Sequence, residues 1–262
     1  MNNAKKFKEK MREDQVPLGV TVTFTDSTVT EALCNVCDFV WIDMEHNSFT
    51  LETVQGHIMA TKGSNTASLV RVRWNDPVII KPVLDIGADG IIVPMVKTAE
   101  DARRAVAACL YPPGGNRGYG PRRTISYGKR GGPAFCNEAN ETMIIILQIE
   151  HIDAINNLDE IFAVPGITSF LMGQHVLAGS MGHMGNPDHP EVVKAIDTYV
   201  NKAINTGVNF SLAGGGDIKT LLAHIDRGVN WLTIGLDFMF MLNKAEEYTH
   251  PLRNYLQTRK TL

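Results

Sequence analysis

Three residues that can carry out acid–base chemistry stand close together in the segment 38–50, which reads DFVWIDMEHNSFT. An apolar run ends there in Asp43, Glu45 and His46. Carboxylates and imidazoles are the side chains that enzymes most often use to move protons. A buried strand that ends in such groups therefore indicates a functional site at the end of that strand.

Polar residues also end several other apolar runs. Arg71 emerges from ASLVRV, where an unpaired cation would be costly, so it requires a carboxylate partner from the protein or from a substrate. Asp43 could pair with this arginine or cap the next helix instead of taking part in chemistry. Glu150 ends the most apolar run of the chain, and further polar or small residues at run ends are Arg73, Gln148, Gly173, Gln174, His175, Ser211 and Asp237.

The elements that must position these residues alternate regularly along the chain. Short β-branched runs at 18–24, 39–44, 67–72, 90–95, 143–150, 166–173, 209–214 and 231–237 are each followed by a helical pattern. Near-continuous apolar runs are typical of parallel strands buried on both faces. Eight such units in 262 residues predict an α/β fold, a (β/α)8 TIM barrel that forms a single domain over residues 1–262.

A doubly wound open sheet is the alternative fold, but it usually carries a Gly-rich fingerprint after its first strand, and FTDSTVTEA is not one. In a barrel, side chains at the carboxyl ends of the strands meet at one mouth. Because neighbours along a strand point to opposite sides, not all of the polar residues can face it.

Composition narrows the functional classes. A net charge of −3 without long charged runs argues against a nucleic-acid surface. No apolar stretch reaches the ~18 residues of a membrane span, and the charged N-terminus lacks the apolar region of a signal peptide. We therefore expect a cytoplasmic protein. Cys34 and Cys37 form a CxxC in a segment with the apolar period of a helix, but no second CxxC completes a zinc site, so we predict buried thiols.

Two segments fall outside the repeating pattern. Residues 111–133 form a long loop rich in Gly, Pro and Arg, which is typical of a functional segment or of a contact with a neighbouring subunit. The C-terminal segment that begins LDFMFMLNKAEEY at residue 236 predicts a helix with more apolar surface than one chain can cover. We expect this helix to serve oligomerisation.

Several motifs together resemble a known family. FVWIDMEHNSFT, LVRVRWNDPVIIKPVLDIGADGIIVPMVKTAEDARRAV, YPPGGNRGYG, LQIEHIDAINNLDEI and MGHMGNPDHPEVVKAI are similar to the HpcH/HpaI class II pyruvate aldolases of the phosphoenolpyruvate/pyruvate barrel superfamily, from about residue 17 to 245. The resemblance implies that His46 matches the family's general base, Arg71 its keto-acid-binding arginine and Glu150 one ligand of its divalent ion. It also implies a homo-oligomer, often a hexamer built from dimers that exchange a C-terminal helix.

The chain departs from the family at the second metal ligand. The family has an Asp after strand six, whereas MGQHVLAGSMG places Val176 there. An isopropyl group offers no lone pair, and Mg²⁺ or Mn²⁺ normally requires several oxygen ligands. His175 lies one position away, and its side chain would point elsewhere. We therefore predict no metal ligands and no cofactor.

A metal-independent subgroup of the same fold is similar to the citrate synthases of siderophore pathways, such as that of staphyloferrin B. This resemblance implies a transferase that condenses acetyl-CoA with oxaloacetate, with a keto acid and an acyl-CoA as its small-molecule partners. In that interpretation Arg71 holds a carboxylate of oxaloacetate, His46 polarises the keto oxygen, and Glu150 removes a proton from the acetyl group. The last two roles can be exchanged.

The remaining predicted substrate-binding residues are Gln148, Gly173, Gln174 and His175, with Arg122 and Arg123 of the long loop for carboxylates or the phosphates of CoA. Two alternatives stay open. One is a lyase, a 4-hydroxy-2-oxoacid aldolase dependent on Mg²⁺ or Mn²⁺. The other is an inactive barrel that only binds a keto acid or a partner protein.

Overall fold

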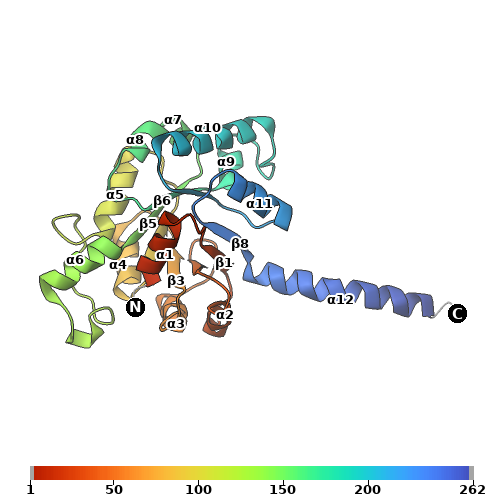
Figure 1. The fold of residues 1–262 in the computed structure, drawn as a ribbon, viewed down its shortest axis with the longest axis horizontal. Coiled ribbons are helices and arrows are strands. Elements are labelled where there is room, and N and C mark those ends of the chain that lie inside the picture. Colours follow the sequence, from red (N-terminus) through yellow and green to blue (C-terminus); the bar gives the residue numbers. More distant parts are fainter. Residues whose placement is uncertain (1–2, 260–262) are drawn as a thin grey trace.

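The structure is a computed structural model that describes residues 3–259 (Figure 1). Its eight strands are all parallel, and each of the first six pairs with the strand that follows it in the sequence, which excludes the doubly wound alternative. The first strand also pairs with the eighth. Every predicted strand is present: Leu18–Val22 (β1), Phe39–Asp43 (β2), Ala67–Arg71 (β3), Gly90–Val93 (β4), Ile144–Ile149 (β5), Ser169–Met172 (β6), Phe210–Leu212 (β7) and Leu232–Leu236 (β8).

Helices form the outer layer. The helical patterns of the sequence at 76–87, 99–110, 189–205 and 217–228 match helices to within two residues at each end. The helices are Asn3–Arg12 (α1), Ser27–Leu33 (α2), Leu51–Ala60 (α3), Pro77–Asp85 (α4), Ala99–Cys109 (α5), Ser126–Gly128 (η1, a 3-10 turn), Gly132–Thr142 (α6), Ile152–Asn156 (α7), Leu158–Phe162 (α8), Gln174–Ser180 (α9), Pro190–Thr206 (α10), Ile218–Asp226 (α11) and Asp237–Arg259 (α12).

The barrel closes between β7 and β8 through single backbone and side-chain hydrogen bonds rather than through a regular ladder. Asn230 donates its backbone N–H to the carbonyl of Phe210 and accepts the N–H of Phe210 on its side chain, both at 2.9 Å. Ser211 donates its hydroxyl to the carbonyl of Trp231 at 2.6 Å. Ser211, a polar strand residue in the sequence, therefore stabilises the closure and is buried away from solvent.

Alternation along the strands separates two cores. One set of side chains packs outward against the helices, and the other fills the interior of the barrel. Phe7 of α1 joins Phe39 and Trp231 in edge-to-face contacts, with ring centroids 5.4–6.2 Å apart. Helix α1 therefore closes the amino-terminal end of the barrel, and the charged mouth lies at the opposite end.

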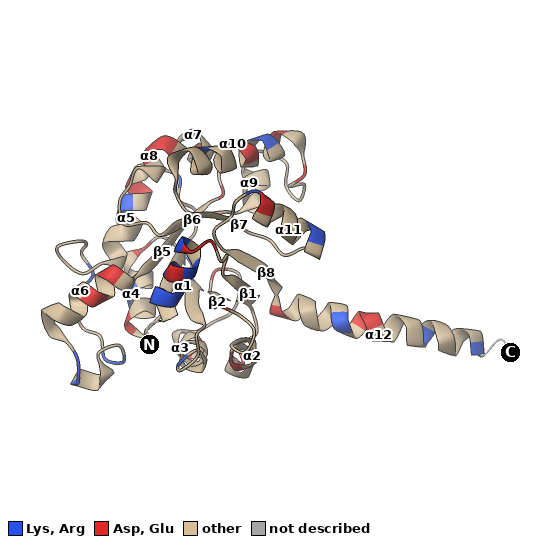
Figure 2. Ribbon diagram, in the orientation of Figure 1, with Lys and Arg blue, Asp and Glu red and all other residues tan. Residues whose placement is uncertain are grey.

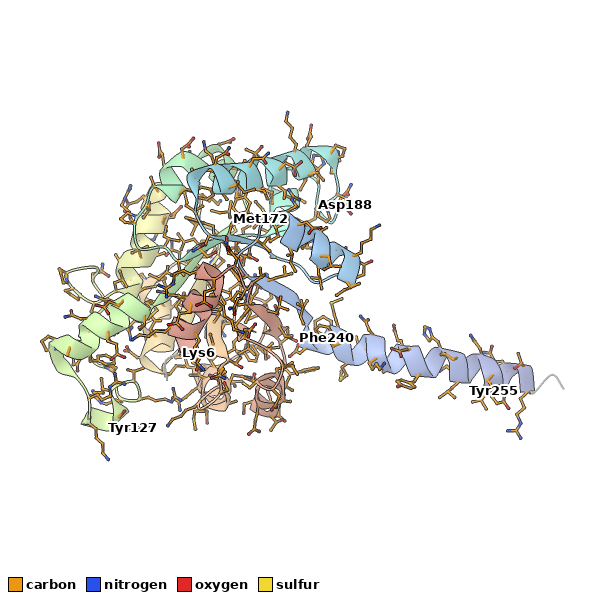
Figure 3. The ribbon with its side chains drawn as sticks, in the orientation of Figure 1. Lys6, Tyr127, Met172, Asp188, Phe240 and Tyr255 are labelled. Atoms are coloured by element: carbon orange, nitrogen blue, oxygen red, sulfur yellow. The ribbon has the colours of Figure 1, made fainter. Side chains whose placement is uncertain are left out.

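Helix α12 projects away from the barrel as a single rod (Figure 1). Charged residues of both signs are scattered along it (Figure 2). Phe240 lies at its barrel end with its ring next to Gly235, and Tyr255 lies near its far end with its side chain in open space (Figure 3). Its exposed apolar side chains are Met239, Phe240, Met241, Leu242, Tyr248, Leu252, Tyr255 and Leu256. Within residues 3–259 nothing covers this surface.

The prediction for the two cysteines of the CxxC is confirmed only in part, because Cys37 is buried whereas Cys34 is half-buried. Their place relative to the helix also differs from the prediction. Helix α2 ends at Leu33, so Cys34 and Cys37 follow the helix instead of lying in it. Both are free thiols, and burial raises the pKa of Cys37 to about 11, which makes it an unreactive core residue. No helix among the described residues is long and apolar enough to cross a membrane.

Candidate active site

The site is organised around Arg71, the last residue of β3. Asp43 ends β2 and lies opposite Arg71 in the strand register, so alternation turns both side chains into the barrel mouth. The Nε of Arg71 donates to Oδ1 of Asp43 at 2.8 Å. Asp43 also accepts from the side chain of Asn47 at 3.0 Å. Arg71 has the carboxylate partner predicted for it, and Asp43 sets its orientation.

Glu45 is a second acidic partner of the same arginine. Its Oε2 lies 3.0 Å from Nη1 of Arg71 and 3.7 Å from Nε2 of His46. Burial raises the pKa of Glu45, with a further contribution from Asp43, whereas the positive charges of Arg71 and His46 oppose the rise. One arginine therefore faces two carboxylates in a partly dry environment.

Glu150 follows β5 and is almost fully buried. Its Oε1 accepts the backbone N–H of Met95 at 2.8 Å, and its Oε2 accepts the side-chain amide of Gln148 at 2.5 Å. Burial raises the pKa of Glu150 from 4.5 to about 7, and the nearby charge of Glu45 adds to the rise. A carboxyl group with this pKa exchanges protons readily near neutral pH.

Gly173, the residue after β6, allows Glu150 to take this position. A Cβ atom on Gly173 would lie 2.7 Å from Oε2 of Glu150 and 2.8 Å from Nε2 of Gln148. No larger residue fits without moving one of these two groups. Gln148 and Gly173 form part of the wall of the mouth, and Glu150 lies directly behind them.

A cavity of about 420 Å³ opens at this mouth. His46, with more than half of its side chain exposed, lies on its wall together with Arg71 and Gln148. The first turn of α9 contributes Gln174, His175 and Val176. The structure therefore brings His46, Arg71, Gln148, Glu150, Gly173, Gln174 and His175 to one place, as predicted, with Glu150 behind the wall.

The structure does not bring Arg122 and Arg123 to this cavity, contrary to the prediction for a single chain. Arg123 donates to the carbonyl of Ile86 at 2.9 Å, next to the end of α4 and before the start of β4. Arg122 donates to backbone carbonyls of its own loop. Tyr127, at the tip of the loop, is well separated from Met172 at the end of β6 (Figure 3). The loop follows a helix, and a helix in this fold returns the chain to the amino-terminal end of the barrel.

Two other polar residues at strand ends have structural roles. Arg73 donates to the carbonyl of Phe49 at 2.6 Å. Asp237 accepts the backbone N–H groups of Thr23 and Phe24 at 2.8 and 3.0 Å, which ties β1 to the start of α12. Both carboxylate oxygens of Asp237 are occupied in this way, whereas Arg73 is an exposed residue that contacts Phe49 through its Nη2.

Several residues of the cavity lie outside the set predicted from the sequence. The guanidinium carbon of Arg71 lies 4.9 Å from the ring centroid of Trp41, so an aromatic face supports the cation from below. Thr21, Thr233, Gly214 and Gly215 complete the opposite wall. Trp41 could have been found, because the two-residue period of a strand places it on the same face as Asp43. Gly214 and Gly215 could not, because a Gly-Gly-Gly segment indicates only a loop.

The donor set of the cavity does not fit the divalent ion of the family. Val176 replaces the second carboxylate and lies on the cavity wall. Both oxygens of Glu150 are already hydrogen-bonded, and Glu45 is paired with Arg71. Among the described residues, His183, His189 and Glu191 are the one group of three potential ligands within 4.8 Å of one another, and they lie between α9 and α10, outside these walls.

An eight-stranded parallel barrel whose charged residues gather at the carboxyl ends of the strands is the arrangement of the (β/α)8 enzymes. The chain belongs to one family of such enzymes, the HpcH/HpaI aldolase/citrate lyase family. The sequence model of this family matches residues 23–243.

Three proteins illustrate the range of family members to which the chain is similar. It is 33% identical over 255 residues to 4-hydroxy-2-oxo-heptane-1,7-dioate aldolase of Klebsiella pneumoniae, covering 95% of each chain. An HpcH/HpaI aldolase/citrate lyase family protein of Burkholderia cenocepacia superimposes with a TM-score of 0.88 and 26% identity, over 94% of this chain and 98% of that one. Citrate synthase SbnG superimposes with a TM-score of 0.79 and 24% identity over 97% of each chain, a likeness that shows the shared fold.

Proposed function

We propose that this protein is a metal-independent citrate synthase that condenses acetyl-CoA with oxaloacetate, an activity of the kind used in siderophore biosynthesis. The observation that carries the proposal is the composition of the cavity. It contains the arginine and the acid–base groups of the family but holds Val176 where the family has a metal-binding carboxylate. Carbon–carbon bond formation then has to rely on proton transfer and fixed charges.

Each residue has a role that follows from its position. Arg71, braced by Asp43 and Trp41, binds a carboxylate of oxaloacetate, and Gln148 lies beside it. His46 is on the cavity wall, where it can donate a hydrogen bond to the keto oxygen. Glu150, with a pKa of about 7, serves as the base for the acetyl methyl group. Its position behind Gln148 and Gly173 requires a small movement of the Gln148 side chain during the reaction.

The reaction balances without further reagents. Glu150 takes a proton from the methyl group of acetyl-CoA, and the resulting enolate attacks the keto carbon of oxaloacetate. The keto oxygen receives a proton from His46 as the new carbon–carbon bond forms. Water then hydrolyses the thioester, which releases citrate and the free thiol of CoA. General acid and base catalysis of this kind contributes about 10²–10⁴-fold for each group.

The alternative is a metal-dependent aldolase that cleaves a 4-hydroxy-2-oxoacid to pyruvate and an aldehyde. It is favoured by the 33% identity to an aldolase over nearly the whole chain. In such an enzyme the metal acts as a Lewis acid on the enolate. The donor set described above argues against this alternative, whereas the sequence similarity argues for it.

Two parallel assays decide between these activities. The first follows release of the CoA thiol from acetyl-CoA and oxaloacetate in excess EDTA, and the second follows pyruvate release from a 4-hydroxy-2-oxoacid with Mn²⁺ or Mg²⁺. We expect turnover in the first assay and little in the second. A protein that is inert in EDTA and recovers fully with Mn²⁺ in the second assay would establish the aldolase in place of the synthase. No turnover in either assay would support a binding protein.

A further inference from the structure

The interactions of Arg71 leave it poorly prepared to bind a substrate carboxylate. A bidentate clamp requires two parallel N–H donors from one edge of the guanidinium group. Nε is bonded to Asp43 at 2.8 Å, and Nη1 lies 3.0 Å from Glu45 and 3.5 Å from Oε1 of Gln148. Among the described residues, only Nη2 has no partner. Nη2 carries two N–H groups, but they diverge, so a second donor parallel to one of them becomes available only when Glu45 leaves Nη1.

The interaction between Glu45 and Arg71 is the weaker of the two ion pairs. Asp43 forms an aligned hydrogen bond to Nε and accepts two further bonds, from the backbone N–H of Glu45 and from Asn47. Oε2 of Glu45, in contrast, is at ion-pair distance from Nη1 but accepts no hydrogen bond of acceptable geometry, although this atom is buried. A buried carboxylate oxygen without a hydrogen bond is costly, so Glu45 is held mainly by charge.

We infer that Glu45 is an internal competitor for Arg71: it neutralises the arginine in the empty site and is displaced from Nη1 by the carboxylate of the keto acid. The inference rests on the proposed role of Arg71 in binding a keto-acid carboxylate. In this arrangement Asp43 holds the guanidinium group in place in both the empty and the occupied site. Glu45 sets how strong the interaction of a ligand carboxylate with Arg71 must be to displace it.

Displacement also makes the site selective among anions. A ligand with one weak oxygen contact cannot replace Glu45, whereas a planar carboxylate can use Nη1 and Nη2 together and recovers the lost ion pair. Glu45 has a direction in which to move, because the positively charged form of His46 would lie on its other side, with Nε2 at 3.7 Å. Glu45 therefore weakens the binding of small anions more than the binding of α-keto acids.

The test is the affinity for oxalate, a planar dicarboxylate that resembles the enolate of a keto acid, measured by calorimetry. Glu45→Gln keeps the shape of the side chain and removes the competing charge, so we expect oxalate to bind roughly tenfold more tightly, as when a half-buried ion pair stops competing. Glu45→Asp keeps the charge and should stay within about threefold of the wild type. Glu52→Gln, an exposed carboxylate at the start of α3, is the matched control and should change nothing.

A second readout separates competition from simple misplacement of Arg71. Glu45→Gln should lower KM for oxaloacetate and leave KM for acetyl-CoA unchanged, because only the keto acid displaces Glu45. Weaker or unchanged oxalate binding in folded Glu45→Gln would overturn the inference and show that Glu45 holds Arg71 in place.

The measurements are made both in excess EDTA and with Mn²⁺. If the wild type binds oxalate only with Mn²⁺, the metal-independent function is refuted, and the comparison of Glu45→Gln with the wild type in Mn²⁺ still decides the role of Glu45. If Arg71→Lys binds oxalate as well as the wild type in both media, the carboxylate lies elsewhere and the inference is overturned, whereas the proposed reaction is still decided by the two turnover assays.

Discussion

Replacing Glu150 with Gln tests the electrostatics of the site without any assumption about its substrate. The folded protein raises the pKa of Glu150 from 4.5 to about 7. Below pH 4.5 the folded and unfolded forms both carry the proton. As the pH rises from 4.5 to 7, the unfolded form loses its proton first, so the free energy of unfolding falls. Above pH 7 both forms are ionised and the loss is complete.

The size of this effect follows from the two pKa values. A pKa difference of one unit corresponds to ~1.4 kcal/mol. The shift of Glu150 from 4.5 to about 7 therefore lowers the free energy of unfolding by at most about 3 kcal/mol. Between pH 5 and pH 8 the wild type should lose about 2.5 kcal/mol through this group as an upper value, and relaxation of the site reduces the expected loss to roughly 1–2 kcal/mol. The Gln variant has no such ionisation and should lack this decline.

The assay is urea unfolding of both proteins at pH 5 and pH 8, at one protein concentration. The amide of the variant will also face the amide of Gln148, but that cost is independent of pH and cancels when the two pH values are compared. Because Glu45 and Glu150 interact, the measured pH dependence reflects the titration of both carboxyl groups together. Glu52→Gln serves as the control for removal of an exposed carboxylate. If the wild type and Glu150→Gln lose the same free energy between pH 5 and pH 8, Glu150 is not held as a neutral acid and the reasoning is wrong.

Three further predictions concern activity, metal binding and assembly. Arg71→Lys should lose most activity, at least about tenfold in kcat/KM, because an ammonium group cannot reproduce the planar fork; near-normal turnover would place the keto-acid carboxylate elsewhere. Val176→Asp should create measurable Mn²⁺ affinity by calorimetry where the wild type has little, and equal affinity in both proteins would show that the substituted position is not part of a metal site. The apolar surface of α12 should make the protein a homo-oligomer built from dimers, and a monomeric mass in light scattering at micromolar concentration would contradict this.

The fold could be predicted from the sequence because each strand is buried on both faces and is bounded by helical patterns. The closure of the barrel floor could not, since the N-terminal segment reads as a charged helix. Its apolar residues Ala4, Phe7 and Met11 lie on one face, and they pack into the barrel interior with Trp231, a contact across more than two hundred residues. Such long-range packing leaves no local signal.

The site was predictable to the same extent and for the same reason. Residues at strand ends converge once the barrel is known, so His46, Arg71 and Glu150 could be grouped in advance. Arg122 and Arg123 could not be placed, because the path of a long loop depends on contacts such as that between Arg123 and Ile86, which no sequence period encodes. The sequence also shows that Arg71 needs an acidic partner without showing that it has two.

Asp43 and Glu45, the two acidic partners of Arg71, give the barrel mouth an excess of negative charge, which opposes substrate binding in either candidate reaction. Asp43, Glu45 and Glu150 surround the single cation of Arg71, so the fully ionised cluster is negative, yet the ligand that it must bind is an anion. A divalent metal would correct the balance, but Val176 removes one of the ligands that hold it. A proton on Glu150 near neutral pH lowers the negative charge by one while the keto acid binds, and Glu150 must release this proton before it can act as the proposed base. Movement of Glu45 away from Arg71 restores a free cationic edge. The raised pKa of Glu150 and the loosely held Glu45 are therefore two parts of one arrangement, in which a proton that Glu150 holds only for a time and a displaced carboxylate make room for the substrate's charge.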